Sequence, residues 1–215
     1  MTRPQAPESV LLRGRDGAIE ALIDTPDTVR GIALVCHPHP LFGGTNTNKI
    51  VHTLARTLRE LGYAVVRPNF RGVGKSEGEH DHGHAETEDM LSVIAWMQSR
   101  WGTLPLALGG FSFGAHVQTR VAARLAGGMT PAHRIVLVGT ATGEVSGARS
   151  YATGPVPKDT LVIHGEEDDT VSLANVLEWA RPQNLPVVVV PGADHFFHAR
   201  LTIIRDIILR NWTPL

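Results

Sequence analysis

The chain has 215 residues, of which 20 are Lys or Arg, 21 are Asp or Glu and 42% are hydrophobic. This balance gives no basic excess for nucleic acid or an anionic membrane surface, while the apolar content suffices for a sizeable core. The single cysteine, Cys36, excludes an internal disulfide and a zinc site built from several cysteines. Because the first ten residues lack the apolar run of a signal peptide and no stretch resembles a membrane span, we expect a cytoplasmic protein that acts on a small molecule.

Strands and helices alternate along the chain after an initial β-hairpin around residues 14–17. The run 32–36 is continuously apolar, which is typical of a strand buried on both faces of a sheet. The pattern predicts strands at 10–13, 19–24, 32–36, 63–67, 104–109, 135–138, 161–164 and 187–190, and helices at about 46–61, 86–100, 114–125, 172–181 and 197–211. Right-handed crossovers then give an α/β fold, a mostly parallel sheet with helices on both faces, whose active site lies beyond the carboxyl ends of the strands.

The strongest motif is Gly110-Phe111-Ser112-Phe113-Gly114, which follows one predicted strand directly and precedes a helix. It matches the pattern G-x-S-x-G in the strand-turn-helix context that the pattern requires. The tight turn holds the serine in a strained, exposed position, and the glycines allow the strand and the helix to approach closely. The motif therefore predicts a nucleophilic serine, Ser112.

A serine nucleophile needs a base, and the base needs an acid that orients it. Both follow the motif in the order Ser, acid, His, each at the end of a predicted strand. His195 is the candidate base, whereas His198 fits a surface position near the last helix. The residues alone leave the acid open within a cluster that consists of Glu166, Glu167, Asp168 and Asp169.

These motifs resemble the α/β-hydrolase superfamily, in particular its small, lidless bacterial members of the dienelactone-hydrolase-like and carboxylesterase-like kind. The resemblance covers nearly the whole chain and rests on segments 36–44, 69–76, 110–114, 165–171 and 192–195. It implies one α/β-hydrolase domain over residues 1–215, and it selects Asp168 as the acid, with Asp169 and Glu167 as the next candidates. Dienelactone hydrolases themselves use a cysteine where this chain has Ser112, so their substrate is not carried over.

An acyl-transfer site also needs hydrogen-bond donors for the oxyanion. In this fold one donor is the backbone N–H of the residue after the nucleophile, which is Phe113 here. The second comes from the loop 37–44, and the resemblance assigns it to Leu41. His37 and His39 in this loop are expected to pack or form hydrogen bonds rather than to react.

The segment 139–160 is short and rich in Gly, Thr, Ser and Pro, so it cannot build a helical lid. The site should therefore be open. Its expected apolar border, which would suit a modest acyl or alkyl group, consists of Leu41, Phe42, Phe111, Phe113 and Phe196. The alternative for the phenylalanines is core packing, which is expected for about half of them.

Three other motifs receive structural interpretations. Residues 72–76 resemble the end of a phosphate-binding loop, but Asn69 stands where that pattern needs glycine. His80, His82 and His84 could bind a metal ion, but a solvated loop is the better interpretation. Cys36 ends a buried run, where free cysteine behaves as a small hydrophobe.

The sequence thus predicts a serine hydrolase that cleaves small carboxylic esters with Ser112, His195 and Asp168, and implies no cofactor and no metal. A thioesterase or a peptidase would use the same three groups. A non-catalytic binding protein on this fold is the alternative from another class, because a fold does not determine a function. The oligomeric state stays open.

Overall fold

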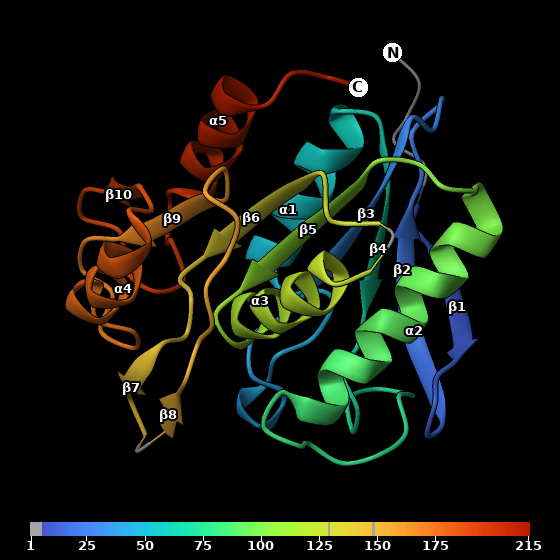
Figure 1. Cartoon of the computed structure of the whole chain (residues 1–215), viewed down its shortest axis with the longest axis horizontal. Helices are drawn as coiled ribbons and strands as arrows, with labels where there is room; N and C mark the ends of the chain where they lie inside the picture. The colour runs from blue at the N-terminus through green and yellow to red at the C-terminus, as the bar shows by residue number, and fades with distance from the viewer. Residues whose placement is uncertain (1–5, 129, 148) are drawn as a thin grey trace.

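An eight-stranded sheet forms the centre of the molecule (Figure 1), whose computed structural model describes residues 6–128, 130–147 and 149–215. Its strands are β1 Glu8–Arg13, β2 Ala18–Asp24, β3 Gly31–Cys36, β4 Tyr63–Pro68, β5 Leu106–Phe111, β6 Arg134–Val138, β9 Leu161–Gly165 and β10 Val187–Val190. They lie in the order β1-β2-β4-β3-β5-β6-β9-β10. The pairs β1·β2 and β2·β4 are antiparallel and all other neighbours are parallel, which confirms the predicted mostly parallel sheet.

Helices cover both faces of this sheet (Figure 1). The helices are α1 Lys49–Glu60, α2 His84–Trp101, α3 Phe113–Ala126, α4 Leu173–Ala180 and α5 Leu201–Asn211. Because side chains alternate between the faces of a strand, β3 sends Leu34 and Cys36 into the core beneath α2, α3 and α4, and sends Ala33 and Val35 into the core beneath α1 and α5. The continuously apolar strands are thus explained by helices on both sides.

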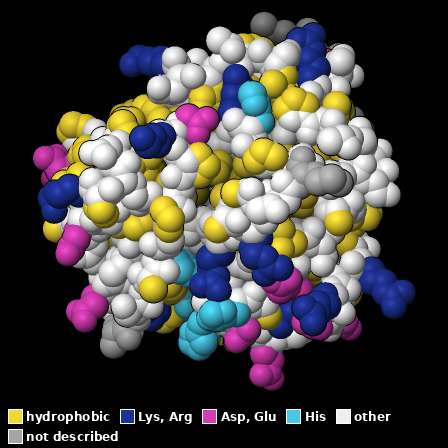
Figure 2. All heavy atoms as spheres, in the orientation of Figure 1, with side chains coloured by type: hydrophobic (Ala, Val, Ile, Leu, Met, Phe, Trp, Pro, Cys, Tyr) yellow, Lys and Arg dark blue, Asp and Glu magenta, His cyan; other side chains and the backbone are white. Residues whose placement is uncertain are grey.

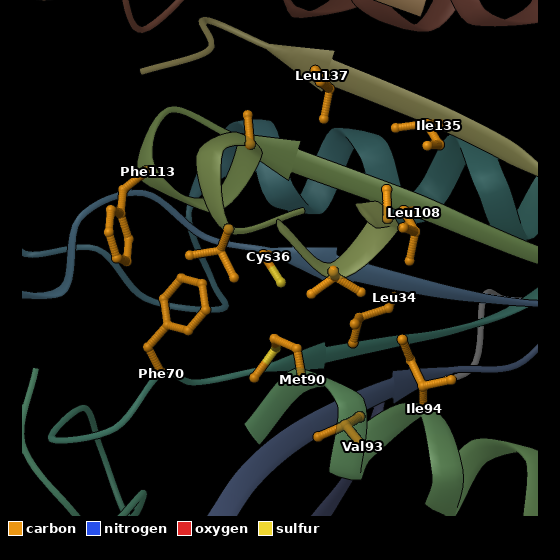
Figure 3. Packing of buried hydrophobic residues seen from close by; sticks show 14 of the residues in the cluster. Leu34, Cys36, Phe70, Met90, Val93, Ile94, Leu108, Phe113, Ile135 and Leu137 are labelled. Carbon is orange, nitrogen blue, oxygen red and sulfur yellow. The ribbon is translucent and has the colours of Figure 1, made fainter. Parts of the chain in front are cut away.

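The core beneath α2 and α3 includes the single cysteine (Figure 3). Cys36 lies among the side chains of Leu34, Phe70 and Met90 and has no exposed surface. Burial raises the pKa of its thiol far above the ordinary value, and Gln118 donates a hydrogen bond to Sγ at 3.3 Å. Such a thiol stays protonated and packs as a hydrophobe.

Strand order places the functional loops together. β3 and β5 are parallel neighbours with Cys36 opposite Gly110, so the loop after β3 and the turn after β5 leave the same edge of the sheet. β9 and β10 end side by side at Gly165 and Val190, which brings their following loops to that edge as well. The carboxyl edge of the sheet is where ligands bind in open α/β folds.

Two elements beside the site differ from the sequence prediction in where they begin or end. Strand β5 extends to Phe111, because Gly110 and Phe111 pair with Cys36 and Val138. Helix α5 begins at Leu201 rather than 197, since positive φ angles of 49° at Phe197 and 56° at Ala199 are incompatible with a helix.

The segment 139–160 contains no helix in its described part. It forms a small antiparallel pair instead, β7 Gly143–Val145 with β8 Arg149–Tyr151. The absence of a helical lid is thus as predicted. Within the described ranges of the chain, no helix is long and apolar enough to cross a membrane.

Candidate active site

Ser112 occupies a strained turn between β5 and α3. Its backbone angles are φ 55° and ψ −116°, a conformation that non-glycine residues rarely adopt. The flanking glycines make the turn possible: a Cβ at Gly110 would lie 2.6 Å from backbone atoms of Ala115, and one at Gly114 would lie 2.4 Å from the carbonyl oxygen of Cys36. The two glycines of the motif therefore allow the helix to pack directly against two strands, with Ser112 between them.

His195 and Asp168 lie next to Ser112 in one chain of hydrogen bonds. The distance from Ser112 Oγ to His195 Nε2 is 3.1 Å, and that from His195 Nδ1 to Asp168 Oδ2 is 2.7 Å. All three residues are buried. When Nδ1–H donates to the carboxylate, Nε2 is left as an acceptor for the serine hydroxyl. This is the tautomer that a general base for Ser112 requires.

Among the acidic candidates, Asp168 alone has a described hydrogen bond to His195. Its second oxygen, Oδ1, accepts hydrogen bonds from the amides of Thr170 at 3.0 Å and Val171 at 2.7 Å, which fix the carboxylate. Asp169 is exposed, and its carboxylate accepts a hydrogen bond from the Thr170 hydroxyl at 3.3 Å. Glu167 is also exposed. Of the acidic candidates, Asp168 is thus the one that the described structure places beside His195 Nδ1.

The imidazole of His195 rests on Phe111, and this differs from the sequence expectation. Phe111 was expected to border the substrate, but its side chain is fully buried with its ring centroid 4.9 Å from that of His195. As the last residue of β5 it points into the core beneath α1 and α5. The Phe113 side chain is likewise buried, in the opposite core. Both rings therefore belong to the protein core beneath the site and do not border the substrate.

The exposed border of the site is smaller than expected. Leu41, Phe42 and Phe196 have 71%, 65% and 41% of their surface exposed. The Phe196 ring lies against His195, with centroids 5.1 Å apart. His198 forms a hydrogen bond with Asp194 at the surface, where it was expected to lie.

The two amides assigned as oxyanion donors, those of Phe113 and Leu41, differ in whether they already have a hydrogen-bond acceptor. Phe113 is the first residue of α3, where an N–H has no partner within the helix. The amide of Leu41, in contrast, already donates to His39 Nδ1 at 3.2 Å. Among the described residues no acceptor is found for the amide of His39 itself. The loop thus offers two candidate donors, the amides of His39 and Leu41. The Leu41 amide must break its hydrogen bond to His39 Nδ1 before it can donate to an oxyanion.

His37 has a packing role, as expected. Its Nε2 accepts a hydrogen bond from the amide of Phe70 at 2.9 Å, so Nδ1 carries the proton and donates to the carbonyl of Pro38 at 2.7 Å. Burial lowers the pKa of His37 to about 4. This neutral imidazole joins the loop after β3 to the loop after β4.

The loop that resembled a phosphate-binding loop is filled by the protein's own groups. Asn69 Oδ1 accepts from the amide of Asn46 at 2.9 Å, and Asn69 Nδ2 donates to the carboxylate of Glu20 at 2.9 Å. The amide of Lys75 donates to the same carboxylate at 3.0 Å. A phosphate there would meet the negative charge of Glu20, which agrees with the structural interpretation.

The histidine tract departs from the predicted solvated loop at His80, whereas His82 and His84 are exposed as predicted. The His80 side chain is only 6% exposed, and its Nδ1 lies 2.8 Å from the buried carboxylate of Glu86. His84 begins α2, and its Nδ1 lies 2.7 Å from a guanidinium nitrogen of Arg120. Together with His82 they line a groove of about 470 Å³ that also contacts Leu41 and Phe42. In the described part of the chain, no cluster of three or more His, Cys, Asp or Glu side chains is placed to hold a metal ion.

Comparisons with known proteins agree with this architecture. A family model described as X-Pro dipeptidyl-peptidase (S15 family) matches residues 18–138. An α/β serine hydrolase homologue from Coxiella burnetii is 35% identical, with a TM-score of 0.84 over 99% of this chain and 100% of its own. An α/β serine hydrolase without a lid, from Xanthomonas campestris, is 34% identical, with a TM-score of 0.86 over 99% and 98%. The lysophosphatidylserine lipase of Danio rerio is 35% identical over 146 residues, which make up 66% of this chain but 38% of the lipase.

The fold and these matches define the class of protein, a serine hydrolase with the α/β-hydrolase fold. Within that class, the chain belongs to the S15 family and stands among the small members without a lid.

Proposed function

We propose that this chain hydrolyses small carboxylic esters through an acyl-enzyme intermediate. The observation that carries the proposal is the continuous set of hydrogen bonds from Ser112 through His195 to Asp168, at 3.1 Å and 2.7 Å. A base at Nε2 and a fixed carboxylate at Nδ1 are what an activated serine needs.

In the first half of the reaction, Ser112 Oγ attacks the carbonyl carbon while His195 Nε2 takes the hydroxyl proton. The carbonyl electron pair moves to the oxygen, and the amide of Phe113 with a donor from the loop after β3 stabilises that oxyanion. The intermediate then collapses, the bond to the leaving oxygen breaks, and His195 gives its proton to the departing alcohol. Asp168 stabilises the imidazolium ion that exists between the two transfers.

In the second half, water replaces the alcohol. His195 removes a proton from the water as its oxygen attacks the acyl carbon, and a second oxyanion forms at the same donors. Collapse breaks the bond to Ser112 Oγ, which recovers its proton from His195, and the carboxylic acid leaves.

Peptide hydrolysis is the second candidate, because the matched family is named for a dipeptidyl peptidase. An enzyme that releases dipeptides binds the free α-ammonium group of its substrate, for which a carboxylate is the ordinary partner. The described lining of the groove beside Leu41 contains histidines and arginines but no Asp or Glu. The positive side chains of the groove favour an ester substrate over a peptide with a free amino terminus. The name of the Danio rerio lipase supports ester chemistry in a relative.

A fluorophosphonate probe followed by a substrate panel tests the proposal. The wild-type protein should be labelled and should hydrolyse p-nitrophenyl acetate, whereas Ser112→Ala should lose both properties. Ser99→Ala, which changes an exposed serine of α2, is the matched control and should keep both. Failure of the wild-type protein to react with the probe and with every ester would reject the proposal. Faster cleavage of dipeptide amides than of matched esters would select the peptidase instead.

A further inference from the structure

The groove beside the active site is lined by several arginine and histidine side chains. It lies between the loop after β3, the start of α2, the first turns of α3, and β8. Arg120 and Arg149 line it together with histidines from three separate parts of the chain, and none of its described lining residues is acidic. Figure 2 shows His side chains next to Lys and Arg side chains at the lower edge of the molecule.

Arg120 is held in place with hydrogen-bonding capacity to spare. One of its terminal nitrogens donates to His84 Nδ1 at 2.7 Å, since a guanidinium ion cannot accept. Its Nε is buried and has no partner among the described residues. A buried guanidinium nitrogen without an acceptor costs free energy, which an anionic oxygen at this position would recover.

Arg149 forms the opposite side of the groove. Its Nε and Nη2 donate to the carbonyl of Ser146 at 3.0 Å and 2.6 Å, and its guanidinium carbon lies 4.2 Å from the ring centroid of Phe42. The carbonyl and the aromatic ring orient this cation but do not neutralise it. Two arginines thus face one groove without a carboxylate between them.

The histidine side chain best described in the groove, His39, adds a hydrogen-bond donor rather than a positive charge. His39 accepts from the Leu41 amide at Nδ1, so in its neutral form it carries its proton on Nε2. Burial and the neighbouring His80 and Arg149 lower the pKa of His39 to about 4. The neutral ring therefore contributes a hydrogen-bond donor and no charge of its own.

Acidic residues near the groove are engaged elsewhere. The carboxylate of Glu86 is buried beneath His80 and accepts from the amides of Asp81 and Gly83, each at 2.9 Å. Asp81 accepts from the amide of Ala85 at 3.1 Å on the outer side of the α2 start. These carboxylates therefore accept from the backbone at the start of α2, and neither is among the groove-lining residues with Arg120 and Arg149.

The groove adjoins the reacting serine. His116 follows Ser112 by one helical turn of α3, with its amide bonded to the Ser112 carbonyl at 3.1 Å. Leu41 and Phe42 belong both to the groove and to the loop that offers oxyanion donors. We propose that the groove binds a carboxylate or phosphate group of the substrate, so that the enzyme selects esters that carry a negative charge. This inference rests on the proposed ester hydrolysis.

Matched substrate pairs test the selection. For the carboxylate, monomethyl glutarate is compared with methyl pentanoate, which has the same chain length without the charge. For the phosphate, 1-acetylglycerol 3-phosphate is compared with 1-acetylglycerol. The wild-type protein should favour at least one charged ester by about tenfold or more in kcat/KM, as expected for a charge-assisted contact with arginine. The arm with the larger ratio identifies the anion.

Arginine variants locate the effect. Arg120→Gln and Arg149→Gln should each reduce the ratio of charged to neutral ester several-fold, and the double variant should bring it close to one. Arg205→Gln removes the same charge from a surface pair with Glu60 and should leave the ratio unchanged. Arg149 lies at the surface, so its variant tests the idea even where Arg120→Gln disturbs packing. A wild-type ratio near one in both arms would overturn the inference.

A measurement of anion binding without catalysis tests the groove independently of the proposed ester hydrolysis. Ser112→Ala cannot turn over an ester, so calorimetric titration of this variant with glutarate or glycerol 3-phosphate measures the groove alone. Binding that is lost in the double arginine variant supports the groove, even if the wild-type protein hydrolyses no ester. Ester hydrolysis with no anion binding and no charge preference leaves the proposed function in place and rejects the groove.

Discussion

Asp168 Oδ2 lies 2.7 Å from His195 Nδ1, on the side of the imidazole away from Ser112. Two backbone amides fix the other oxygen of this carboxylate, so the aspartate cannot rotate without breaking both bonds. The carboxylate therefore holds the ring in one tautomer and in one orientation. This function depends on position rather than on charge alone.

We expect Asp168→Asn to lower kcat for p-nitrophenyl acetate by roughly three to four orders of magnitude, because the amide stabilises the wrong tautomer of His195. Asp169→Asn is the matched control. It makes the same chemical change at the next residue, which is exposed and makes no described contact with His195. Equal losses in the two variants would contradict the role assigned to Asp168.

Gly114 is expected to be required for the fold. A Cβ there would lie 2.4 Å from the carbonyl oxygen of Cys36 and 2.5 Å from that of His37, both of which belong to the backbone. Gly114→Ala should therefore lower the free energy of unfolding by about 1–3 kcal/mol or more and shift the start of α3. Denaturant unfolding measures the loss.

Gly154→Ala provides the control for that experiment. A Cβ at Gly154 meets no atom within 4 Å, and its φ lies outside the left-handed region. This variant should change the stability of the protein by less than about 1 kcal/mol. Similar losses at both positions would show that the tight contact with β3 is not the cause.

The fold could be predicted from the sequence, and so could the proximity of Ser112, Asp168 and His195, because each lies in the turn or loop that follows a parallel strand. Parallel strands end at one edge, so residues far apart in the chain meet there by topology alone. The glycines around Ser112 added a local requirement that can be recognised without a structure. The choice among the acids came from family resemblance, since their spacing alone left the choice open.

The groove could not be predicted in the same way. Its cationic and histidine side chains come from the loop after β3, the start of α2, the middle of α3 and β8, which share no motif or period. The tract of His80, His82 and His84 was visible in the sequence, but the burial of His80 against Glu86 and the contact of His84 with Arg120 depend on tertiary packing. The engaged amide of Leu41 likewise depends on the orientation of one neighbouring imidazole.

Acid should destabilise the fold through its buried neutral histidines. Burial is the largest cause that lowers the pKa values of His37, His39 and His116, each from 6.5 to about 4. Between these values the unfolded chain binds protons that the folded chain does not, so the free energy of unfolding falls as the pH falls from 6.5 towards 4. His37, the most buried of the three, contributes about 3 kcal/mol over the full range.

Urea unfolding at a series of pH values between 8 and 4 measures this dependence. Stability should be level above pH 7, decline through the range between 6.5 and 4, and flatten with respect to these groups below it. A folded state equally stable at pH 7 and pH 5 would contradict the neutral assignment of these histidines.

The open site should limit the length of acyl chain that contributes to binding. Each buried methylene contributes about 0.8 kcal/mol, but only where apolar protein surface receives it. The exposed apolar side chains at the site are Leu41, Phe42 and Phe196, while the groove beyond them is lined with imidazole and guanidinium groups. The value of kcat/KM for p-nitrophenyl esters should therefore rise at most from acetate to butyrate and then level off.

The same geometry predicts no activation at an oil surface. The described part of 139–160 holds only the short strands β7 and β8 and no helix that could cover and uncover Ser112. The rate should pass smoothly through the concentration at which the substrate forms an emulsion. Measurement below and above that concentration, with the butyrate and octanoate esters, tests both expectations at once. A rate that continued to rise to octanoate, or increased abruptly with the emulsion, would require an apolar channel where the structure has a cationic groove.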